Sequence, residues 1–354
     1  MAVLTEEQTM LRDMAREWAD NESPVTAFRK MRDAAPAALF DTAGWQSQVE
    51  MGWAGILIPE AQGGAGMDYV TLGSVLEQLG RTLTASPLAA TSAAASAIML
   101  GGSEAQKAEW LPKIATGEVI ATLAIDEGPR FDPAKIAASV SGGKLSGAKE
   151  FVAEGDSAQL FVAAAVDGLY LVPGDAGVTR STRHMVDFRS HAQVVFDNAP
   201  ADKLEGVDLG AVTDRAAAAT CAEMLGMAEA AFAQTNDYLK TRVQFGQVLA
   251  SFQALQHRMA KMFTELELMR SAVEGALEAI DGGRPDVPQA VSVAKAVAGD
   301  TLKLVSSEMV QLHGGIGMTD EHDAGFYLKR ARVLETMWGN SAWHRERFAR
   351  LGGY

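Results

Sequence analysis

The stretch RVQFGQVLASFQALQHRMAKMFTELELM, residues 242–269, begins with a short polar and aromatic run and then takes on a helical pattern. From Phe252 onward, apolar residues recur at steps of three and four, which is the spacing of one face of an α-helix. The stripe continues to Leu277 without a break, and its members are Phe252, Leu255, Met259, Met262, Leu266, Met269, Val273 and Leu277. Such a long stripe is typical of a helix bundle, where it is buried in the chain's own core, and its methionines would also suit a contact between subunits.

The rest of the chain divides according to the period of its apolar residues. Residues 1–117 show one helical pattern after another, residues 118–205 show short strand-like runs separated by turn signals, and residues 206–354 are helical again. We therefore predict an α+β multidomain protein. It would have an N-terminal helical domain over 1–117, a middle antiparallel β domain over 118–205 and a C-terminal four-helix bundle over 206–354.

Local signals predict where several of these elements begin and end. Gly80 is predicted to follow the last turn of a helix over residues 70–79. Asp286 is predicted to cap the helix that begins directly after Asp286. In the β domain, the turn signals Ser141-Gly142-Gly143 and Asp167-Gly168 each predict a hairpin.

Composition excludes several classes of function. The 354-residue chain carries a formal net charge of −14, with no run of Lys or Arg, so its surface would repel nucleic acid. A phosphorylated ligand would therefore require the few cations to be concentrated at its site. No cluster of metal-ligating residues is predicted.

The single cysteine and the absence of address signals suggest where the protein acts. Cys221 lies within a helical apolar pattern and is predicted to be a buried small residue rather than a nucleophile. The first residues lack the apolar core of a signal peptide, and no apolar run is long enough to span a membrane. We expect a cytoplasmic protein that does not associate with membranes.

Taken singly, Arg242 would be a surface helix cation and Gly314-Gly315 an ordinary turn, whereas together the two short motifs carry groups that suit a dinucleotide. Arg242 can supply a guanidinium fork for a pyrophosphate, and the Gly314-Gly315 pair allows the backbone to approach it because no Cβ intervenes. Neutral hydrogen bonds and an apolar wall would come from the residues around them, which are Gln244, Phe245, Leu249, Gln253 and Gln311.

At these motifs the chain resembles the acyl-CoA dehydrogenases. The first motif is Arg242-Val243-Gln244-Phe245-Gly246, and the second is Gln311-Leu312-His313-Gly314-Gly315-Ile316-Gly317. The resemblance covers nearly the whole length in the right order, and its further segments are Gly52-Trp53, Ile58-Pro59-Glu60, Gly63-Gly64-Ala65-Gly66 and Glu77-Gln78-Leu79-Gly80-Arg81.

The resemblance implies a function and a set of partners. In the family, the two motifs reach across a subunit interface and hold the FAD of the neighbouring chain. A glutamate removes the α-proton of an acyl-CoA thioester, the flavin takes a hydride from Cβ, and an electron-transferring flavoprotein reoxidises the flavin. The chain is thus expected to form a dimer or tetramer.

The catalytic glutamate is absent from both positions at which the family places it. The resemblance aligns Trp338 with the commoner position, and Gly339 and Asn340 with the two residues that follow the glutamate. A less common position, near the start of the helix before the arginine motif, corresponds to Ala216. Neither side chain can accept a proton, since the indole Nε1–H is only a donor.

Two nearby carboxylates are weaker candidates for the base. Glu335 precedes Trp338 by three residues and would share a face with it if the segment were helical. Asp214 lies two residues before Ala216, about 200° around a helix, and would point away unless the helix began later. His313 is expected to be a structural hydrogen bonder.

The β domain also departs from the family at the positions that serve a chain's own flavin. Asp126-Glu127-Gly128-Pro129 replaces a Thr-Glu-Pro run. The Asp126 carboxylate would disfavour the reduced, anionic flavin ring. Phe151-Val152-Ala153 replaces a Trp-x-Thr segment, and Ala153 has no hydroxyl to bond the flavin.

These departures predict a non-catalytic subunit that completes the FAD site of a homologous, catalytic acyl-CoA dehydrogenase subunit. Such two-gene enzymes in the family tend to act on steroid-derived thioesters. Two alternatives stay open. One is a self-sufficient homo-oligomeric dehydrogenase that uses Glu335 or Asp214, and the other is a redox-inactive binding or scaffold subunit.

Overall fold

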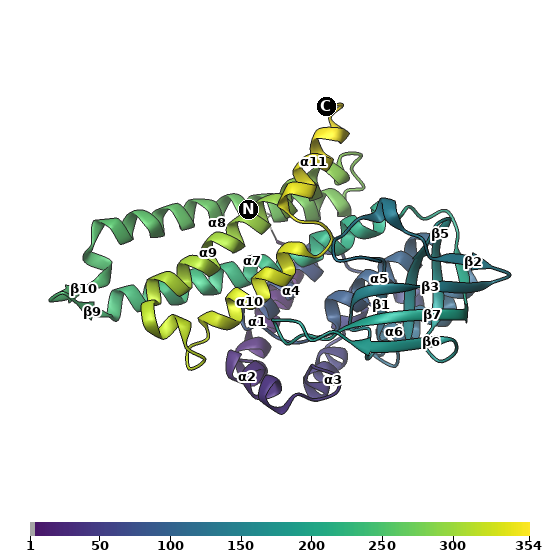
Figure 1. Ribbon diagram of the computed structural model, residues 1–354, viewed down its shortest axis with the longest axis horizontal. Helices are drawn as coiled ribbons and strands as arrows, with labels where there is room; N and C mark the ends of the chain where they lie inside the picture. Colours follow the sequence, from purple (N-terminus) through teal and green to yellow (C-terminus); the bar gives the residue numbers. More distant parts are fainter. Residues whose placement is uncertain (1–3) are drawn as a thin grey trace. The chain divides into compact units, whose positions relative to one another are not determined.

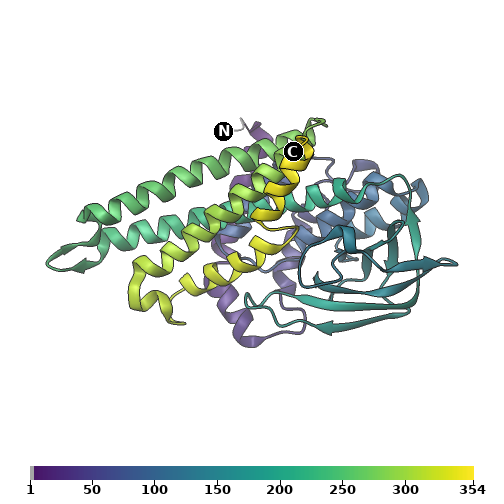
Figure 2. The ribbon, with the colours of Figure 1, turned by 45° about the horizontal axis from the view of Figure 1, so that its top comes forward.

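The computed structural model describes residues 4–354, which fall into two compact units (Figures 1 and 2). Each unit combines segments that are distant in the chain. The first unit comprises Met1–Ala27, Gly73–Thr84 and Ala217–Tyr354, and the second comprises Phe28–Leu72 and Ala85–Ala216. The predicted domain boundaries at 117/118 and 205/206 stay predictions.

Helices build the first unit. Its long helices are α7 (Leu209–Thr241, of which residues 217–241 belong here), α8 (Gln253–Asp281) and α9 (Val287–His313). The other helices are α1 (Glu6–Glu22), most of α4 (Tyr69–Arg81), α10 (Ala324–Thr336) and α11 (Ser341–Leu351). The predicted C-terminal helix bundle is confirmed. In the part of the chain that the structure describes, no helix is both long and apolar enough to cross a membrane.

The apolar stripe of α8 forms part of the bundle core. Its side chains from Met262 to Leu277 are buried, whereas Phe252, Leu255 and Met259 at the start of the helix are only partly buried. The start of α8 lies at the end of the bundle beside a short hairpin of β9 (Val243–Gln244) and β10 (Gln247–Val248) (Figure 1). The stripe is therefore core over most of its length and accessible at one end.

The prediction that Gly80 ends its helix is wrong, because α4 continues through Gly80 to Arg81. A Cβ on Gly80 would lie 2.3 Å from the backbone oxygen of Glu223 in α7, and a Cβ on Gly226 of α7 would lie 1.8 Å from the backbone oxygen of Glu77. The two glycines thus allow the backbones of α4 and α7 to pack in direct contact. This is a packing requirement between helices, which a C-terminal glycine signal does not distinguish from a helix end.

Asp286 occupies the N-cap position of α9, but its side chain makes no capping hydrogen bond. Its carboxylate instead accepts from Nε and Nη2 of Arg284, two residues earlier. The guanidinium is a charged donor and competes successfully with the helix N–H groups.

Two four-stranded sheets form the centre of the second unit. One has the order β1-β4-β5-β8 and the other β2-β3-β7-β6. The first sheet consists of β1 (Ala121–Ala124), β4 (Leu160–Ala165), β5 (Gly168–Pro173) and β8 (Asp202–Leu204). The second consists of β2 (Ser139–Ser141), β3 (Lys144–Ala153), β6 (Val178–Thr182) and β7 (His191–Pro200). The helices of this unit include α3 (Thr42–Glu50), α5 (Leu88–Gly101) and α6 (Glu104–Ala115), and α2 (Val25–Ala34) lies mostly in it.

The predicted antiparallel pairing of the middle region is confirmed, with one exception. The strand β1 pairs in parallel with β4, because the chain between them builds the hairpin of β2 and β3 in the other sheet. The first predicted hairpin is confirmed, with Gly142 and Gly143 as its turn residues because Ser141 already pairs with Lys144. The turn between β4 and β5 lies one residue earlier than predicted, since Ala165 pairs with Gly168.

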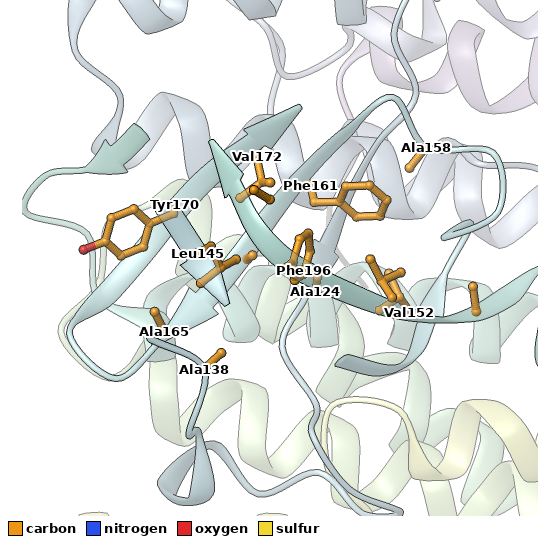
Figure 3. Close-up of a cluster of buried hydrophobic side chains, with 14 residues drawn as sticks. Ala124, Ala138, Leu145, Val152, Ala158, Phe161, Ala165, Tyr170, Val172 and Phe196 are labelled. Carbon is orange, nitrogen blue, oxygen red and sulfur yellow. The ribbon is translucent and has the colours of Figure 1, made fainter. Parts of the chain in front are cut away.

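Inward-facing side chains of both sheets share one core (Figure 3). Phe161 of β4 and Phe196 of β7 meet edge to face, with ring centroids 5.7 Å apart and planes at 81°. Figure 3 shows these two rings in the cluster together with Leu145 and Val152 of β3, the strand that pairs with β7. A tightly packed sandwich of this kind holds the ends of β1 and β3 in fixed positions.

Candidate functional site

The arginine motif forms an exposed hairpin between two long helices. Arg242 follows the last residue of α7, and its carbonyl accepts from the N–H of Leu249, which closes the base of the hairpin. Phe245 and Gly246 are the two turn residues between paired Gln244 and Gln247, and both have positive φ, 55° and 79°. Two positive φ values are the requirement of a tight hairpin turn of the primed type.

Phe245 is 87% exposed, although it is a large aromatic residue in a strained backbone position. Within the described chain its aromatic neighbour is Phe252, edge-on at 6.1 Å. Exposing this ring costs apolar burial and a positive φ costs about 1–2 kcal/mol. The hairpin therefore has the features of a contact for something outside the chain.

The glycine motif forms a turn at the end of α9. Gly314 has φ 65° and ψ −137°, a conformation open essentially only to glycine. Gly315 has no positive φ, and a Cβ added there would meet, among residues 4–354 and apart from its two chain neighbours, no atom within 4 Å. The chain itself therefore does not require glycine at 315, whereas a group approaching the backbone from outside would.

The structure brings the two motifs to the same end of the bundle (Figures 1 and 2). Tyr238, in the last turn of α7, stacks on His313, the last residue of α9, with ring centroids 4.3 Å apart. The Tyr238 hydroxyl also donates to the carbonyl oxygen of His313 at 3.3 Å. We call the hairpin residues 242–249, Gln253 and the turn residues 311–315 the bundle end.

The polar side chains of the bundle end are available to a ligand. Arg242, Gln244, Gln253 and Gln311 are exposed, and within residues 4–354 none of their side chains has a hydrogen-bond or ion-pair partner. Leu249 is partly buried beneath the hairpin. A guanidinium, three amides and an open glycine backbone can bind an anionic dinucleotide.

His313 has a structural role, as expected. Its Nδ1–H donates to the Met309 carbonyl at 2.7 Å, and its ring lies between those of Tyr238 and His322, the latter 4.4 Å away. Burial lowers the pKa of His313, so the ring is neutral at physiological pH.

A second feature of the first unit is the segment between α10 and α11, residues 337–340, which we call the Trp338 loop. Trp338 has φ 56°, its indole Nε1–H donates to Oγ1 of Thr220 in α7 at 3.1 Å, and its carbonyl oxygen contacts Nε2 of His344 at 2.9 Å. Because the partner is a carbonyl, Nε2 of His344 carries the hydrogen.

Lys295 of α9 binds the backbone on both sides of Trp338. Its fully buried ammonium donates to three carbonyl oxygens, those of Leu334, Glu335 and Gly339, at 3.0, 3.1 and 3.0 Å. Two of these belong to the last turn of α10, where carbonyls lack helix partners and a cation is favourable.

Burial sets the charges around this ammonium. It lowers the pKa of Lys295 to about 8, raises that of Cys221 to about 12 and lowers that of His344 to about 3. Lys295 is thus the cation at neutral pH, while His344 and the Cys221 thiol are uncharged. The prediction that Cys221 is a buried small residue is confirmed.

The two candidate carboxylates occupy different surroundings. Glu335 forms ion pairs with Arg332 at 3.2 Å and Lys303 at 3.6 Å, and it does not share a helix face with Trp338 because α10 ends at Thr336. Asp214 is buried in the second unit within α7, which begins at Leu209, so it and Ala216 lie on different sides of that helix.

Comparison with known proteins decides the family. The family model "Acyl-CoA dehydrogenase, N-terminal domain" matches residues 5–118, and "Acyl-CoA dehydrogenase, C-terminal domain" matches residues 210–352. The chain is 32% identical to "Acyl-CoA dehydrogenase IpdE2" of Mycolicibacterium smegmatis over 98% of both chains.

This chain belongs to the acyl-CoA dehydrogenase family. Among solved structures, it is similar to the "Tcur3481-Tcur3483 steroid ACAD G363A variant", with a TM-score of 0.93, 30% identity and 98% of each chain covered. It is also similar to a chain of a structure described as the electron transferring flavoprotein of Acidaminococcus fermentans, with a TM-score of 0.89, 27% identity and 99% of each chain covered.

Acyl-CoA dehydrogenases are FAD-dependent oxidoreductases that act on CH–CH donors. The bundle end of this chain fits part of such a cofactor, because its arginine and amides lack partners within residues 4–354 and Gly315 leaves space for a close approach. The predicted cofactor residues therefore lie together, apart from the Trp338 loop at the other end of α9.

The positions that the resemblance assigns to the chain's own flavin lie in the second unit, and their side chains fit a flavin poorly. Ala153 offers a methyl group, and its carbonyl accepts from Oγ1 of Thr122 at 2.6 Å. The Glu127 carboxylate accepts from the N–H groups of Ala137 and Ala138 and from buried Lys149, at 2.7, 2.9 and 2.6 Å. Its oxygens are committed to the fold of the loop.

Asp126 adds a further obstacle to an anionic ring. Burial raises the pKa of Asp126 to about 6 in spite of the nearby Lys149 ammonium, so at neutral pH the group is still mostly a carboxylate. Its Oδ1 is buried and has no hydrogen-bond partner within the described chain.

Sequence reasoning missed the two buried lysines. Lys295 interrupts the apolar run Val291–Ala298 of α9 and could have been noted as a cation within a core pattern. Lys149 lies on a strand with an irregular burial pattern and a register shift at 149–152, so alternation did not place it inside.

Proposed function

We propose that this chain is the non-catalytic subunit of a hetero-oligomeric acyl-CoA dehydrogenase, which oxidises an acyl-CoA thioester between Cα and Cβ. The observation that carries the proposal is the state of the Trp338 loop. At the position of the family's base, an indole N–H donates to Thr220 and cannot accept a proton. Ala216, at the less common position, is a buried methyl group.

The alternative bases have less support. The Glu335 carboxylate forms ion pairs with Arg332 and Lys303, which orient it toward these cations. Asp214 lies inside α7 on a different side from Ala216. A self-sufficient enzyme would need one of these carboxylates to reach the substrate.

In this proposal the bundle end serves the FAD of a catalytic, homologous subunit. When bound, FAD would supply the hydride acceptor of the reaction. Arg242 would bind the pyrophosphate, Gln244, Gln253 and Gln311 would hydrogen-bond polar edges of the cofactor, and Phe245 and Leu249 would cover its apolar parts. Gly314 and Gly315 would allow their backbone to approach it.

The partner and substrate classes follow from the relatives. One similar structure is described with two gene products and as a steroid ACAD, which supports a two-chain enzyme and a steroid-derived thioester for this chain. Another is described as an electron transferring flavoprotein, which supports that class as the electron acceptor. We propose an assembly of dimer or tetramer size in the cytoplasm.

The test is the flavin-to-protein ratio of the chain purified alone and co-purified with a catalytic acyl-CoA dehydrogenase subunit. We expect little flavin alone and one flavin per pair of chains in the complex. Arg242→Ala should lower flavin retention of the complex by about 10- to 100-fold, because a charge-assisted hydrogen bond to phosphate contributes about 1.5–3 kcal/mol. Arg16→Ala, which removes an exposed arginine of α1, is the matched control.

Two results would contradict the proposal. A yellow homo-oligomer that an acyl-CoA bleaches would make the chain a self-sufficient enzyme, and Glu335→Gln and Asp214→Asn would then identify its base. A complex whose turnover and flavin content do not depend on Arg242 would make the chain a redox-inactive scaffold.

A further inference from the structure

We propose that the Trp338 loop is a built-in plug: the Trp338 indole, seated against Thr220, fills the place in this chain's own bundle where an acyl group would meet a base. The chain would then exclude acyl thioesters rather than bind them without turnover. The proposal rests on the alignment of Trp338 with the base position in the proposed function.

The backbone of Trp338 is the first sign of a built feature. A bulky residue with φ 56° is strained, and such a conformation persists only where surrounding contacts over-determine it. Here both ends of the residue are held, because the indole N–H donates to Thr220 and the carbonyl oxygen accepts from His344. The indole is thereby directed at α7.

One face of α9 supports the loop. Lys295 uses three hydrogen bonds to bind the carbonyls of Leu334, Glu335 and Gly339, so the segments before and after Trp338 are tied to the same ammonium. Gly299, one turn later on α9, allows Ser341 to approach, since a Cβ there would lie 2.4 Å from the Ser341 Oγ. A loop with these attachments has little freedom to swing aside.

The base position and the plug are therefore the same structural element. A loop that only lacked its glutamate could leave a space able to bind an acyl chain. The anchored indole instead occupies that space with a rigid apolar group, which is held by the Lys295 ammonium and by a His344 ring that burial keeps uncharged.

The experiment measures how much the acyl group adds to binding by the isolated, full-length chain. Calorimetric titrations with octanoyl-CoA and with free CoA give a ratio of affinities for each variant. For the wild-type chain we expect a ratio close to one. For Trp338→Ala we expect a ratio of about tenfold or more, because burying two acyl methylenes is already sufficient for that gain.

Matched variants keep the result interpretable. Trp110→Ala removes an equal indole on α6, outside the loop and its attachments, where the ring lies beside Lys113, and it should leave the ratio close to one. Trp338→Leu replaces Trp338→Ala if the alanine variant does not fold. Lys295→Met should raise the ratio in smaller measure, since the indole stays but its loop is released.

Three outcomes would overturn the proposal. They are a tenfold or greater ratio for the wild-type chain, a ratio below threefold for a folded Trp338→Ala or Trp338→Leu variant, and an equal gain in Trp110→Ala. None of them depends on flavin. If the affinity ratios contradict the plug but the flavin content of the complex depends on Arg242, the proposed function stands. If the ratios agree with the plug but the flavin content does not depend on Arg242, the proposed function alone fails.

Discussion

Replacing Asp126 by asparagine should stabilise the protein at neutral pH. The carboxyl group has a pKa raised by burial from 3.8 to about 6, and a shift of this size corresponds to about 3 kcal/mol of disfavoured charge. Asparagine removes the charge but also its attraction to Lys149, so we expect a gain of about 2 kcal/mol in the free energy of unfolding at pH 7.5. Lys149 keeps its pairing with Glu127 at 2.6 Å in the variant.

The sign of the pH dependence makes this prediction specific. Because the folded-state pKa of Asp126 is the higher one, the folded wild-type protein holds the proton between pH 3.8 and about 6, and its stability falls as pH rises through that window. The advantage of asparagine should therefore shrink to below about 1 kcal/mol at pH 4.5.

Urea unfolding of wild type and Asp126→Asn at pH 7.5 and 4.5 measures both values. Asp132→Asn is the control, because Asp132 is an exposed carboxylate of the same segment whose pKa is lowered by its hydrogen bond to Lys135, and it should give no gain. An unchanged or lower midpoint for Asp126→Asn at pH 7.5, or a gain of equal size at both pH values, would refute the reasoning.

Three further predictions concern the first unit. Gly226→Ala should destabilise the chain by about 3 kcal/mol or more in urea unfolding, since its Cβ would lie 1.8 Å from the Glu77 backbone oxygen; a change below about 1 kcal/mol would contradict the close helix contact. Gly315→Ala should leave unfolding within about 0.5 kcal/mol of wild type yet lower flavin retention in the complex, and equal retention would show that nothing approaches that backbone. The folded-state pKa of His344 is lowered from 6.5 to about 3, so acid favours the unfolded chain, and wild type should lose up to about 2 kcal/mol between pH 7 and 5 relative to His344→Gln; parallel pH profiles of the two would argue against a neutral, buried ring.

The sequence was most informative where a pattern repeats. The stripe of α8 and the turn signal at 141–143 rest on many residues or on a turn with one backbone solution, and both were predicted correctly. Gly80 was misread because a glycine at a helix end and a glycine at a helix crossing have the same local sequence signal. The parallel pairing of β1 with β4 was missed because the two strands are separated by a hairpin of the other sheet.

The sequence predicted only part of the candidate site. Short motifs placed Arg242 and Gly315 in one site, and the Tyr238–His313 contact now gives the physical reason for their proximity. No motif indicated the clamp of Lys295 and His344, because its acceptors are backbone carbonyls, which every residue carries. Contacts of side chains with backbone atoms are set by tertiary packing, and a single sequence does not report them.

The exposure of the bundle end and the enclosure of the Trp338 loop place opposite demands on one helix, α9. At its C-terminal end, Gln311 and the glycine turn leave polar groups and backbone exposed, where a ligand or partner can bind them. In its N-terminal third, Lys295 uses all its donors inside the chain, so the ammonium has none left for a ligand. A chain that catalysed the reaction alone would need the second region open as well. This difference supports the proposal that the chain contributes its end to another subunit's site while its own site stays closed.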